Sequence, residues 1–378
     1  MIYLAFFISL LYGFLILYLS KGIDRLKNIK SDNNTHENSF SILVPFRNEE
    51  LNLPALLKSL NALDYPTTQF EILLINDASS DSSESIVNQY KAEHPKLNIS
   101  LINNEAVNGS PKKNAIKKGI TIAAYDWIIT TDADCVVPES WLRVLDTKIK
   151  QQSPKMIVAP VSYIPKSSFL HNFQCLDFLS LQGITMGSFG MKDKNFGHPF
   201  LCNGANLCYS KESFNAVNGF DGNDHIPSGD DVFLLEKMFQ KYPEEIEFIK
   251  SKEAIVLTSS KDSFKELIQQ RVRWAAKTTA YNSLYTKLVG LLVFMTSLSL
   301  VILFILGAIG QLKWLQVGFI FLLKFNIDFV LLYKTSQFFE QQKVMKSYFL
   351  SSLLHPFYTV LIAVLSLKKS YTWKDRAY

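Results

Sequence analysis

The chain has 378 residues, of which 48% are hydrophobic and 19% are charged, and its formal net charge is +5 at pH 7. This length exceeds what one small domain needs, so we expect a soluble core and an accessory region. The modest positive charge gathers near apolar segments, which favours contact with anionic lipid head groups over nucleic-acid binding. Because the Gly-rich fingerprints of dinucleotide-binding and P-loop enzymes are absent, neither a dehydrogenase nor an ATPase is favoured.

Residues 1–21 are predicted to form a transmembrane anchor. Residues 2–20 carry no charge, and at about 1.5 Å rise per residue they roughly match a bilayer core of about 30 Å. A cleaved signal peptide is the alternative, but the basic residues, beginning with Lys21 and Arg25, follow the apolar run, and no small-residue cleavage pattern comes after it. By the positive-inside rule the same basic residues place the next domain on the cytosolic side of the cytoplasmic membrane.

A polar linker at residues 22–39 lacks apolar periodicity and is expected to be mobile. A domain of soluble character follows at residues 40–285, and in its first part strand and helix patterns alternate. Strands are predicted at residues 40–45, 70–77, 97–104 and 126–134, and helices at residues 49–63, 82–94 and 111–123. Such alternation is typical of parallel βαβ units, so we expect an α/β fold with an open, doubly wound sheet.

The C-terminal part, residues 286–367, is predicted to hold two or three transmembrane segments. The apolar runs are residues 288–310, 315–333 and 348–367. Lys324 and Asp328 in the middle run are four residues apart, so they share a helical face and are able to pair inside a bundle. A basic tail follows at 368–378. If all three runs cross, this tail lies opposite the side that its lysines favour, so one run is a candidate for a re-entrant or interfacial segment.

Three aspartates follow predicted strands. Asp77 comes after the strand at 71–76, and Asp132 and Asp134 come after the strand at 127–131. Because ligands of open α/β sheets collect at the carboxyl ends of strands, all three carboxylates are expected on one rim. Paired carboxylates suit Mg²⁺ or Mn²⁺, which leave positions open for phosphate oxygens and water, so a nucleoside diphosphate is the obvious partner. Taken alone, the Asp-Ala-Asp tripeptide is interpreted equally well as a solvated turn.

Other stretches of the sequence favour a functional site over a solvated turn. Seven motifs, including the tripeptide, occur in order along the chain. They are LVPFRNEE (43–50), INDASSD (75–81), PKKNAIKKGI (111–120), TTDAD (130–134), NGANLCYSKESFNAVNGFD (203–221), SGDD (228–231) and QRVRW (270–274). Together they resemble the family 2 glycosyltransferases, inverting nucleotide-sugar enzymes with a GT-A fold, and in particular the membrane-embedded members with a Gln-x-x-Arg-Trp motif. The resemblance covers roughly residues 40 to 285. It implies a GT-A-like, Rossmann-type sheet that is mixed but mainly parallel, flanked by helices, with transmembrane helices beside it.

The resemblance also implies roles on the donor side of the site. In the family, the residue matching Asp77 contacts the nucleotide base. The residue matching Asp132 approaches the ribose and diphosphate, and the one matching Asp134 holds the Mg²⁺ or Mn²⁺, with Asp132 beside it. Three more positions match the nucleotide-sugar side: Pro45, Glu49 and Lys112.

On the acceptor side, Asp231 matches the general base of the family, and Asp230 is then a supporting carboxylate near the acceptor. A base has to lie within hydrogen-bond reach of the acceptor hydroxyl and be ionised at working pH. The other interpretation of residues 228–231 is a helix start, with Ser228 as N-cap and acidic residues in the first turn. The two interpretations are compatible.

The Gln-x-x-Arg-Trp motif places Gln270, Arg273 and Trp274 on one helical face. The guanidinium suits a leaving diphosphate, and the indole suits stacking on an acceptor. An interfacial anchor, with Trp274 at head-group depth, is the other interpretation. The apolar segment 169–190 remains open between a core helix and a membrane-surface helix.

The predicted function is inverting, metal-dependent transfer of a sugar from a nucleotide-sugar to a hydroxyl of a membrane lipid or lipid-linked acceptor. A uridine donor is implied by the resemblance alone. Processive polysaccharide synthases share the motif, but they generally need several membrane helices, so single transfer is favoured. Two other classes stay open: a transport subunit that senses nucleotide-sugars, with Lys324 and Asp328 marking its pathway, and an inactive nucleotide-sugar-binding scaffold.

Overall fold

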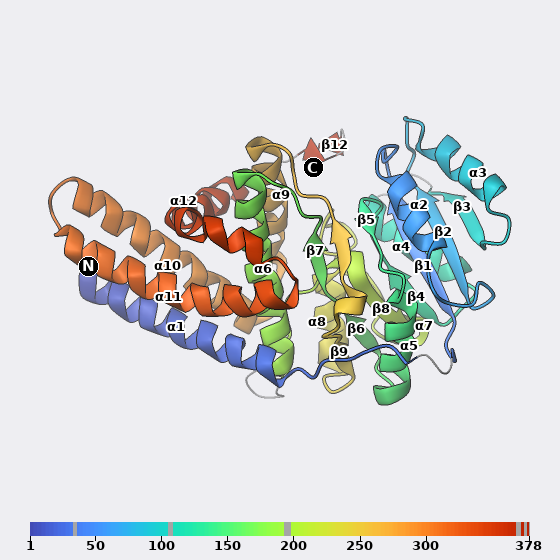
Figure 1. The fold of residues 1–378 in the computed structure, drawn as a ribbon, viewed down its shortest axis with the longest axis horizontal. Helices are drawn as coiled ribbons and strands as arrows, with labels where there is room; N and C mark the ends of the chain where they lie inside the picture. The colour runs from blue at the N-terminus through green and yellow to red at the C-terminus, as the bar shows by residue number, and fades with distance from the viewer. Residues whose placement is uncertain (33–35, 105–108, 193–197, 368–371, 374–375, 378) are drawn as a thin grey trace.

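The computed structural model describes residues 1–32, 36–104, 109–192, 198–367, 372–373 and 376–377. An α/β domain lies at one end of the molecule and a bundle of long helices at the other (Figure 1). The helices are α1 (Ile2–Arg25), α2 (Leu53–Asn61), α3 (Ser83–Glu93), α4 (Pro111–Ile122), α5 (Trp141–Gln152), α6 (Phe169–Gly190), α7 (Lys211–Ala216), α8 (Val232–Lys241), α9 (Phe264–Ala276), α10 (Leu284–Ala308), α11 (Trp314–Phe338) and α12 (Tyr348–Ser366).

The strands of the main sheet are β1 (Phe40–Phe46), β2 (Phe70–Asn76), β3 (Ile99–Asn103), β4 (Trp127–Thr130), β6 (Met156–Val158), β8 (Leu207–Ser210) and β9 (Ile246–Phe248). Their order is β3-β2-β1-β4-β8-β6-β9, and β8 runs antiparallel to both of its neighbours while the remaining pairs are parallel. This confirms the mixed, mainly parallel sheet. A second sheet joins β5 (Cys135–Val136), β10 (Val256–Thr258) and β7 (Val161–Tyr163).

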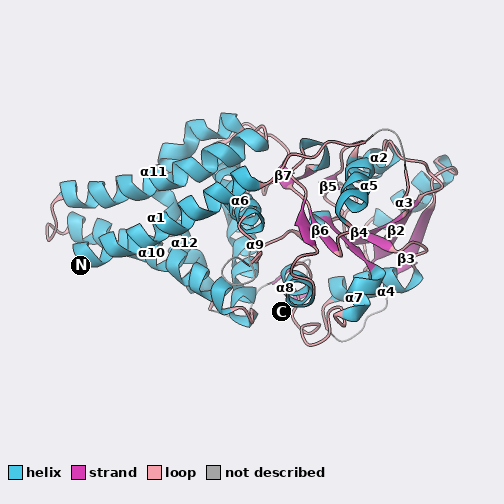
Figure 2. Ribbon diagram, turned by 90° about the horizontal axis from the view of Figure 1, so that it is seen from below, coloured by secondary structure: helices cyan, strands magenta, loops and turns pink. Residues whose placement is uncertain are grey.

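Helices cover both faces of the main sheet, with α2 and α5 on one side and α4 and α7 on the other (Figure 2). Strand β2 is buried along its whole length, as a strand covered on both faces must be. Every strand and helix predicted between residues 40 and 134 is present. Helix α2 begins at Leu53 rather than at Glu49, because Pro54 fits the first turn of a helix but not its interior.

The polar linker differs from its prediction, because its described residues are held against the domain. Asn28 pairs with Lys250 in an isolated bridge. The backbone amide of Asp32 donates to Thr147 Oγ1 over 2.9 Å, and that of Asn38 donates to an α5 carboxylate over 2.9 Å. Figure 1 shows this segment running from α1 along the domain to β1. Its lack of periodicity reflects polar rather than apolar contacts with α5.

Four helices are long and apolar enough to cross a membrane: Ile2–Arg25, Leu284–Ala308, Trp314–Phe338 and Gln342–Ser366. Lys324 and Asp328 form the ion pair that their spacing predicts, and the hydroxyl of Tyr12 donates to Asp328 Oδ1 over 2.6 Å. The prediction for the basic tail rests mainly on Lys368, Lys369 and Lys374, which lie outside the described residues.

Helix α6 joins the two parts of the molecule. Most of its residues are buried, and it packs against α1 and α11 on one side and against strands β7 and β9 on the other. One apolar cluster runs from Ile16 of α1 through Leu179 of α6 to Val158 of β6. Of the two interpretations left open for this segment, the structure therefore shows a core helix, placed where the bundle meets the sheet.

Candidate active site

One cavity of about 1040 Å³ lies between the main sheet, helices α6, α8 and α9, and the helical bundle. All eleven residues that the sequence singles out for the site line it: Pro45, Glu49, Asp77, Lys112, Asp132, Asp134, Asp230, Asp231, Gln270, Arg273 and Trp274. Strands β1, β2 and β4 are parallel neighbours, so the loops after them meet at one edge of the sheet. The donor-side residues therefore share an edge although they are far apart in sequence.

Asp77, which follows β2, is positioned by residues at the ends of the two neighbouring strands, β1 and β3. Its amide donates to the carbonyl of Phe46, the last residue of β1, over 2.8 Å. Its Oδ1 accepts from Nδ2 of Asn104, which follows β3, over 2.9 Å. Arg47 Nη1 donates to the Asp77 carbonyl over 2.8 Å. Asn104 was not among the predicted site residues, although it is the last residue of a predicted strand, a position that resembles that of Asp77.

Lys112 connects the donor and acceptor sides of the cavity. Its Nζ lies 2.7 Å from Asp132 Oδ1 and 3.1 Å from Asp230 Oδ2. Burial by itself lowers the pKa of Lys112, but the neighbouring carboxylates outweigh burial and raise that pKa above its usual value. Gly204 closes this cluster, because a Cβ there would stand 3.0 Å from Asp230 Oδ2 and 3.4 Å from Lys112 Nζ.

Asp231 is both a cavity residue and the N-cap of α8. Its Oδ1 accepts from the amide of Val232 over 2.7 Å, and its Oδ2 accepts from the amide of Gly204 over 3.3 Å. The prediction of Ser228 as N-cap is therefore wrong. Helix α8 begins at Val232, three residues after Gly229, whose φ of +81° does not belong to a helix. The same residue, Asp231, therefore both caps the helix and lines the cavity, as the two compatible interpretations of this segment allow.

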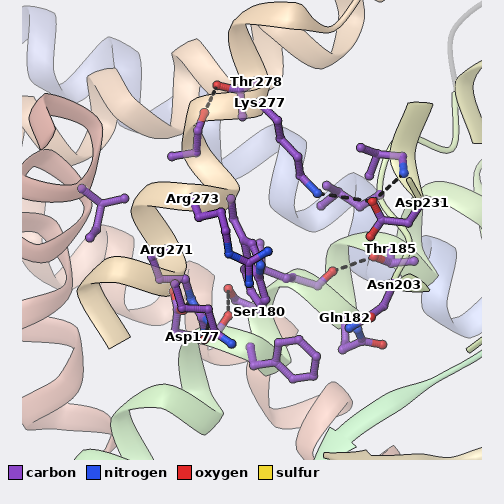
Figure 3. A pocket seen from close by; sticks show the side chains of 18 of the residues that line it. Asp177, Ser180, Gln182, Thr185, Asn203, Asp231, Arg271, Arg273, Lys277 and Thr278 are labelled. Carbon is purple, nitrogen blue, oxygen red and sulfur yellow. Dashed lines mark hydrogen bonds and ion pairs between the residues drawn. The ribbon is translucent and has the colours of Figure 1, made fainter. Parts of the chain in front are cut away.

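Lys277, which the sequence analysis did not single out, is the cation beside Asp231. Its Nζ lies 3.3 Å from Asp231 Oδ1, and Figure 3 shows the side chain extended toward that carboxylate. Burial by itself raises the pKa of Asp231, but Lys277 and then Lys112 outweigh burial and lower it. Lys277 lies four residues after Arg273 in the sequence. Helical spacing would therefore have placed it on the face of the Gln-x-x-Arg-Trp motif.

Helix α9 carries the three motif residues along the cavity, and Figure 3 shows Arg273 pointing into it. Arg271, which lies inside the motif, contacts two of these residues and the neighbouring helix α6. Its Nε donates to Asp177 Oδ2 of α6 over 2.7 Å and its Nη1 donates to Gln270 Oε1 over 2.6 Å. Its guanidinium lies 4.3 Å from the centroid of the Trp274 ring, within range of a cation–π contact.

The donor set of Asp132 and Asp134 fits Mg²⁺ or Mn²⁺. Within the described residues no cluster of three or more His, Cys, Asp or Glu side chains could hold a metal. Two carboxylates on the turn after β4 match an ion that takes its other ligands from phosphates and water, whereas a structural zinc site needs a complete protein cage.

Residues 41–215 match the model of glycosyl transferase family 2. This part of the chain is a family 2 glycosyltransferase domain. The poly-β-1,6-N-acetyl-D-glucosamine synthase of Staphylococcus epidermidis is 30% identical over 167 residues, which are 43% of this chain and 38% of that protein. The enzyme of the same name from Staphylococcus aureus strain COL is 28% identical over 174 residues, 45% of this chain and 40% of that protein. The chain thus matches about two fifths of the length of these curated relatives.

A solved structure shares the architecture beyond the family 2 domain. The mannosyltransferase PcManGT of Pyrobaculum calidifontis, in complex with GDP-Man and Mn²⁺, aligns with a TM-score of 0.58 at 14% identity. The alignment covers 93% of this chain and 96% of that one. At this identity the likeness shows the fold alone, and it supports a GT-A-like arrangement for the family 2 domain.

Proposed function

We propose that the protein is a membrane-bound, inverting glycosyltransferase that moves a sugar from a nucleotide-sugar to a hydroxyl of a membrane lipid or lipid-linked acceptor. One observation carries this proposal: a single cavity is lined by the sheet-edge carboxylates, by Asp231 and by the membrane-side helices. A donor bound at the sheet edge and an acceptor in the bundle would meet at Asp231. The cytosolic face of the cytoplasmic membrane is where nucleotide-sugars and such a lipid meet.

The donor site is assigned to the edge formed by β1, β2 and β4. Asp77 receives the nucleotide base, and Pro45 and Glu49 line the loop beside it. Lys112 and Asp132 face the diphosphate, and Lys112 also neutralises carboxylates that would otherwise repel it. The uridine base rests on the family resemblance, and N-acetylglucosamine is the sugar named by both staphylococcal relatives.

Asp132 and Asp134 would hold Mg²⁺ or Mn²⁺, which when bound supplies positive charge against the growing charge of the leaving nucleoside diphosphate. Arg273 faces the same cavity and is suited to bind the diphosphate through two hydrogen bonds. These fixed charges would act on the leaving group where its negative charge develops.

Asp231 is assigned as the general base. Lys277 and Lys112 lower its pKa, so the carboxylate is ionised at neutral pH and able to accept the proton of the acceptor hydroxyl. The hydroxyl oxygen then bonds to the anomeric carbon from the side opposite the leaving diphosphate, which inverts the configuration. No covalent enzyme intermediate is needed. Asp230 and Trp274 border the space for the acceptor.

Processive polysaccharide synthesis is the second candidate function. The names of the two staphylococcal relatives specify a polymer, which favours repeated transfer. Their similarity covers 43% and 45% of this chain, however, so more than half of the chain lies outside it. We favour single transfer because four candidate membrane helices are few for a polymer channel.

The test is to incubate the purified full chain with a panel of nucleotide-sugars, Mg²⁺ or Mn²⁺ and native membrane lipid, and to weigh the products by mass spectrometry. We expect one lipid to gain the mass of one sugar. Asp231→Asn should abolish the product while still binding donor, and Asp221→Asn, an exposed aspartate paired with Lys117, is the control. A ladder of repeated mass increments would favour the polymer synthase. No transfer from any donor would refute both.

A further inference from the structure

The cavity does not end at the catalytic carboxylates. It continues between helices α10, α11 and α12, where the aliphatic side chains of Val289, Val293, Leu331, Leu332 and Ile362 line it beside polar ones such as Lys324, Asp328 and His355. We call this part the bundle groove. Near the end of α10, Phe304 packs against Phe357 in the middle of α12, with the ring centroids 5.7 Å apart. The first part of α10, up to Phe294, lines the cavity, and α12 lines it along its whole length.

Two buried hydroxyls line the bundle groove without a partner among the described residues. Tyr358 is 7% exposed and Ser351 is 4% exposed, and neither Tyr358 Oη nor Ser351 Oγ has a hydrogen-bond partner. Buried polar groups are nearly always paired, because leaving a buried hydroxyl unpaired costs free energy. These two atoms therefore suit the polar end of an amphiphilic ligand, next to the aliphatic residues of the groove.

Gly290 marks an open side of the groove. It lies on α10 among the lining residues, and a Cβ built there would meet no atom within 4 Å. Its neighbour Leu291 is 54% exposed. Helix α10 is long and apolar enough to cross a membrane, and with α10 in a bilayer this opening would face the lipid phase. A molecule dissolved in the bilayer is thus able to enter from the side.

We infer that the bundle groove binds the hydrocarbon chain of the acceptor, an amphiphilic alcohol that enters from the bilayer between α10 and α12. The inference rests on the proposed function and names the occupant of this part of the site. Aliphatic side chains of valine, leucine and isoleucine suit methylene groups, and the open side at Gly290 suits a molecule that arrives from the bilayer. With the chain in the groove, the hydroxyl end reaches the side of the cavity that holds Asp231 and Trp274.

The test fills the groove at Gly290 and compares this with a matched change elsewhere. Gly290→Phe places a ring in the open space, and it is not expected to unfold α10, since glycine is the weakest helix former after proline. Gly318→Phe is the control. Gly318 lies on α11, a Cβ there also meets nothing within 4 Å, and it is not among the residues that line the cavity.

The probe is a long-chain fatty alcohol with a diazirine in its chain, photoactivated with the full-length protein in nanodiscs. Wild type and Gly318→Phe should be labelled within residues 286–294 and 355–366. Labelling of Gly290→Phe at these residues should be about tenfold weaker, because displacing as few as two methylenes from the groove lowers affinity by about that factor. Equal labelling of Gly290→Phe and wild type would overturn the inference.

Failure of this inference is distinguishable from failure of the proposed function, because sugar transfer to native lipid is measured separately on wild-type protein. If wild type transfers sugar and Gly290→Phe is labelled and active like wild type, the function stands and the groove assignment falls. If wild type shows groove labelling but no transfer with any donor, the glycosyltransferase falls and the lipid site stands. A variant that keeps its labelling but makes shorter polymers would show a glycan in the groove, and that also overturns the inference.

Discussion

Lys277 Nζ lies 3.3 Å from Asp231 Oδ1. Lys277 directly follows helix α9 and Asp231 is the N-cap of α8, so this contact joins the end of one helix to the start of the other. Both side chains are mostly buried, with 11% and 15% exposure. The contact joins the helix of the Gln-x-x-Arg-Trp motif to the proposed base. The position of α9 and the ionisation of Asp231 are therefore linked.

Replacing Lys277 by Met should move the acidic limb of the pH profile of kcat/KM to higher pH. Lys277 favours the ionised form of Asp231 and lowers its pKa, so without that cation the pKa rises. A base has to be ionised to act, so activity is lost first at the acidic end. Lys277→Arg should keep the wild-type limb, and Lys265→Met, which alters an exposed lysine of α9, is the control. An unshifted limb in Lys277→Met would contradict the role given to this contact.

Chelation should abolish transfer, and added Mg²⁺ or Mn²⁺ should restore it. Asp134→Asn should raise the metal concentration needed for half-maximal activity by about tenfold or more, since the amide replaces a charged ligand of a hard cation. Donor titrations at several metal concentrations measure this. The matched change Asp221→Asn alters an exposed carboxylate outside the cavity and should leave the metal requirement unchanged. Full activity in excess EDTA would end the metal assignment.

The first strands and helices of the sheet and the cavity residues were predicted from different kinds of sequence information. The alternation of short apolar runs with helical patterns was enough to predict β1 to β4 and the helices between them, because parallel strands that are buried on both faces are continuous apolar runs in the sequence. Asp77 and Asp132 were found because each directly follows such a run. Their shared edge is then a consequence of parallel pairing between β2, β1 and β4.

The partners of these residues were harder to predict, because each depends on contacts between distant segments. Arg271 and Asp177 are 94 positions apart, and no local pattern links them. Lys277 was missed although its spacing from Arg273 was visible, since a lysine after an amphipathic helix is usually a solvated one. The linker was predicted as mobile because its hydrogen bonds go to side chains of α5, which periodicity does not detect.

The Arg271–Asp177 pair should be important for stability. The side chains are only 6% and 12% exposed, and His355 Nε2 lies 3.3 Å from the other carboxylate oxygen. Arg271→Met should lower the free energy of unfolding by about 3–5 kcal/mol, because it leaves a buried carboxylate without its counterion. The double variant Arg271→Met, Asp177→Leu should recover most of that loss. Thermal unfolding in detergent measures the cycle, and additive losses would contradict a coupled pair.

The same pair predicts a loss of stability in acid. Burial by itself raises the pKa of Asp177, but Arg271 and His355 outweigh burial and lower it to about 2. Because the folded pKa is below the unfolded value of about 3.9, this contribution is fully present above about pH 4 and is lost as the pH falls toward 2. The unfolding midpoint of wild type should therefore fall more steeply over this range than that of the double variant, which lacks the carboxylate. Parallel curves would contradict the prediction.

The last prediction concerns the crossing of α1 and α6, where glycines let two backbones approach. A Cβ at Gly187 would clash with the backbone of Leu19, and a Cβ at Gly190 would clash with the backbone of Gly22. Backbone cannot yield as a side-chain tip does, so Gly187→Ala should separate the helices and destabilise the protein by about 1–3 kcal/mol. Gly318→Ala adds the same methyl group where space is open, and it should be neutral or slightly stabilising. Because α6 also packs on the strands beside the cavity, Gly187→Ala should lower sugar transfer as well as the unfolding temperature. A variant that loses stability but keeps full transfer would show that the bundle is held to the catalytic domain by contacts other than this crossing.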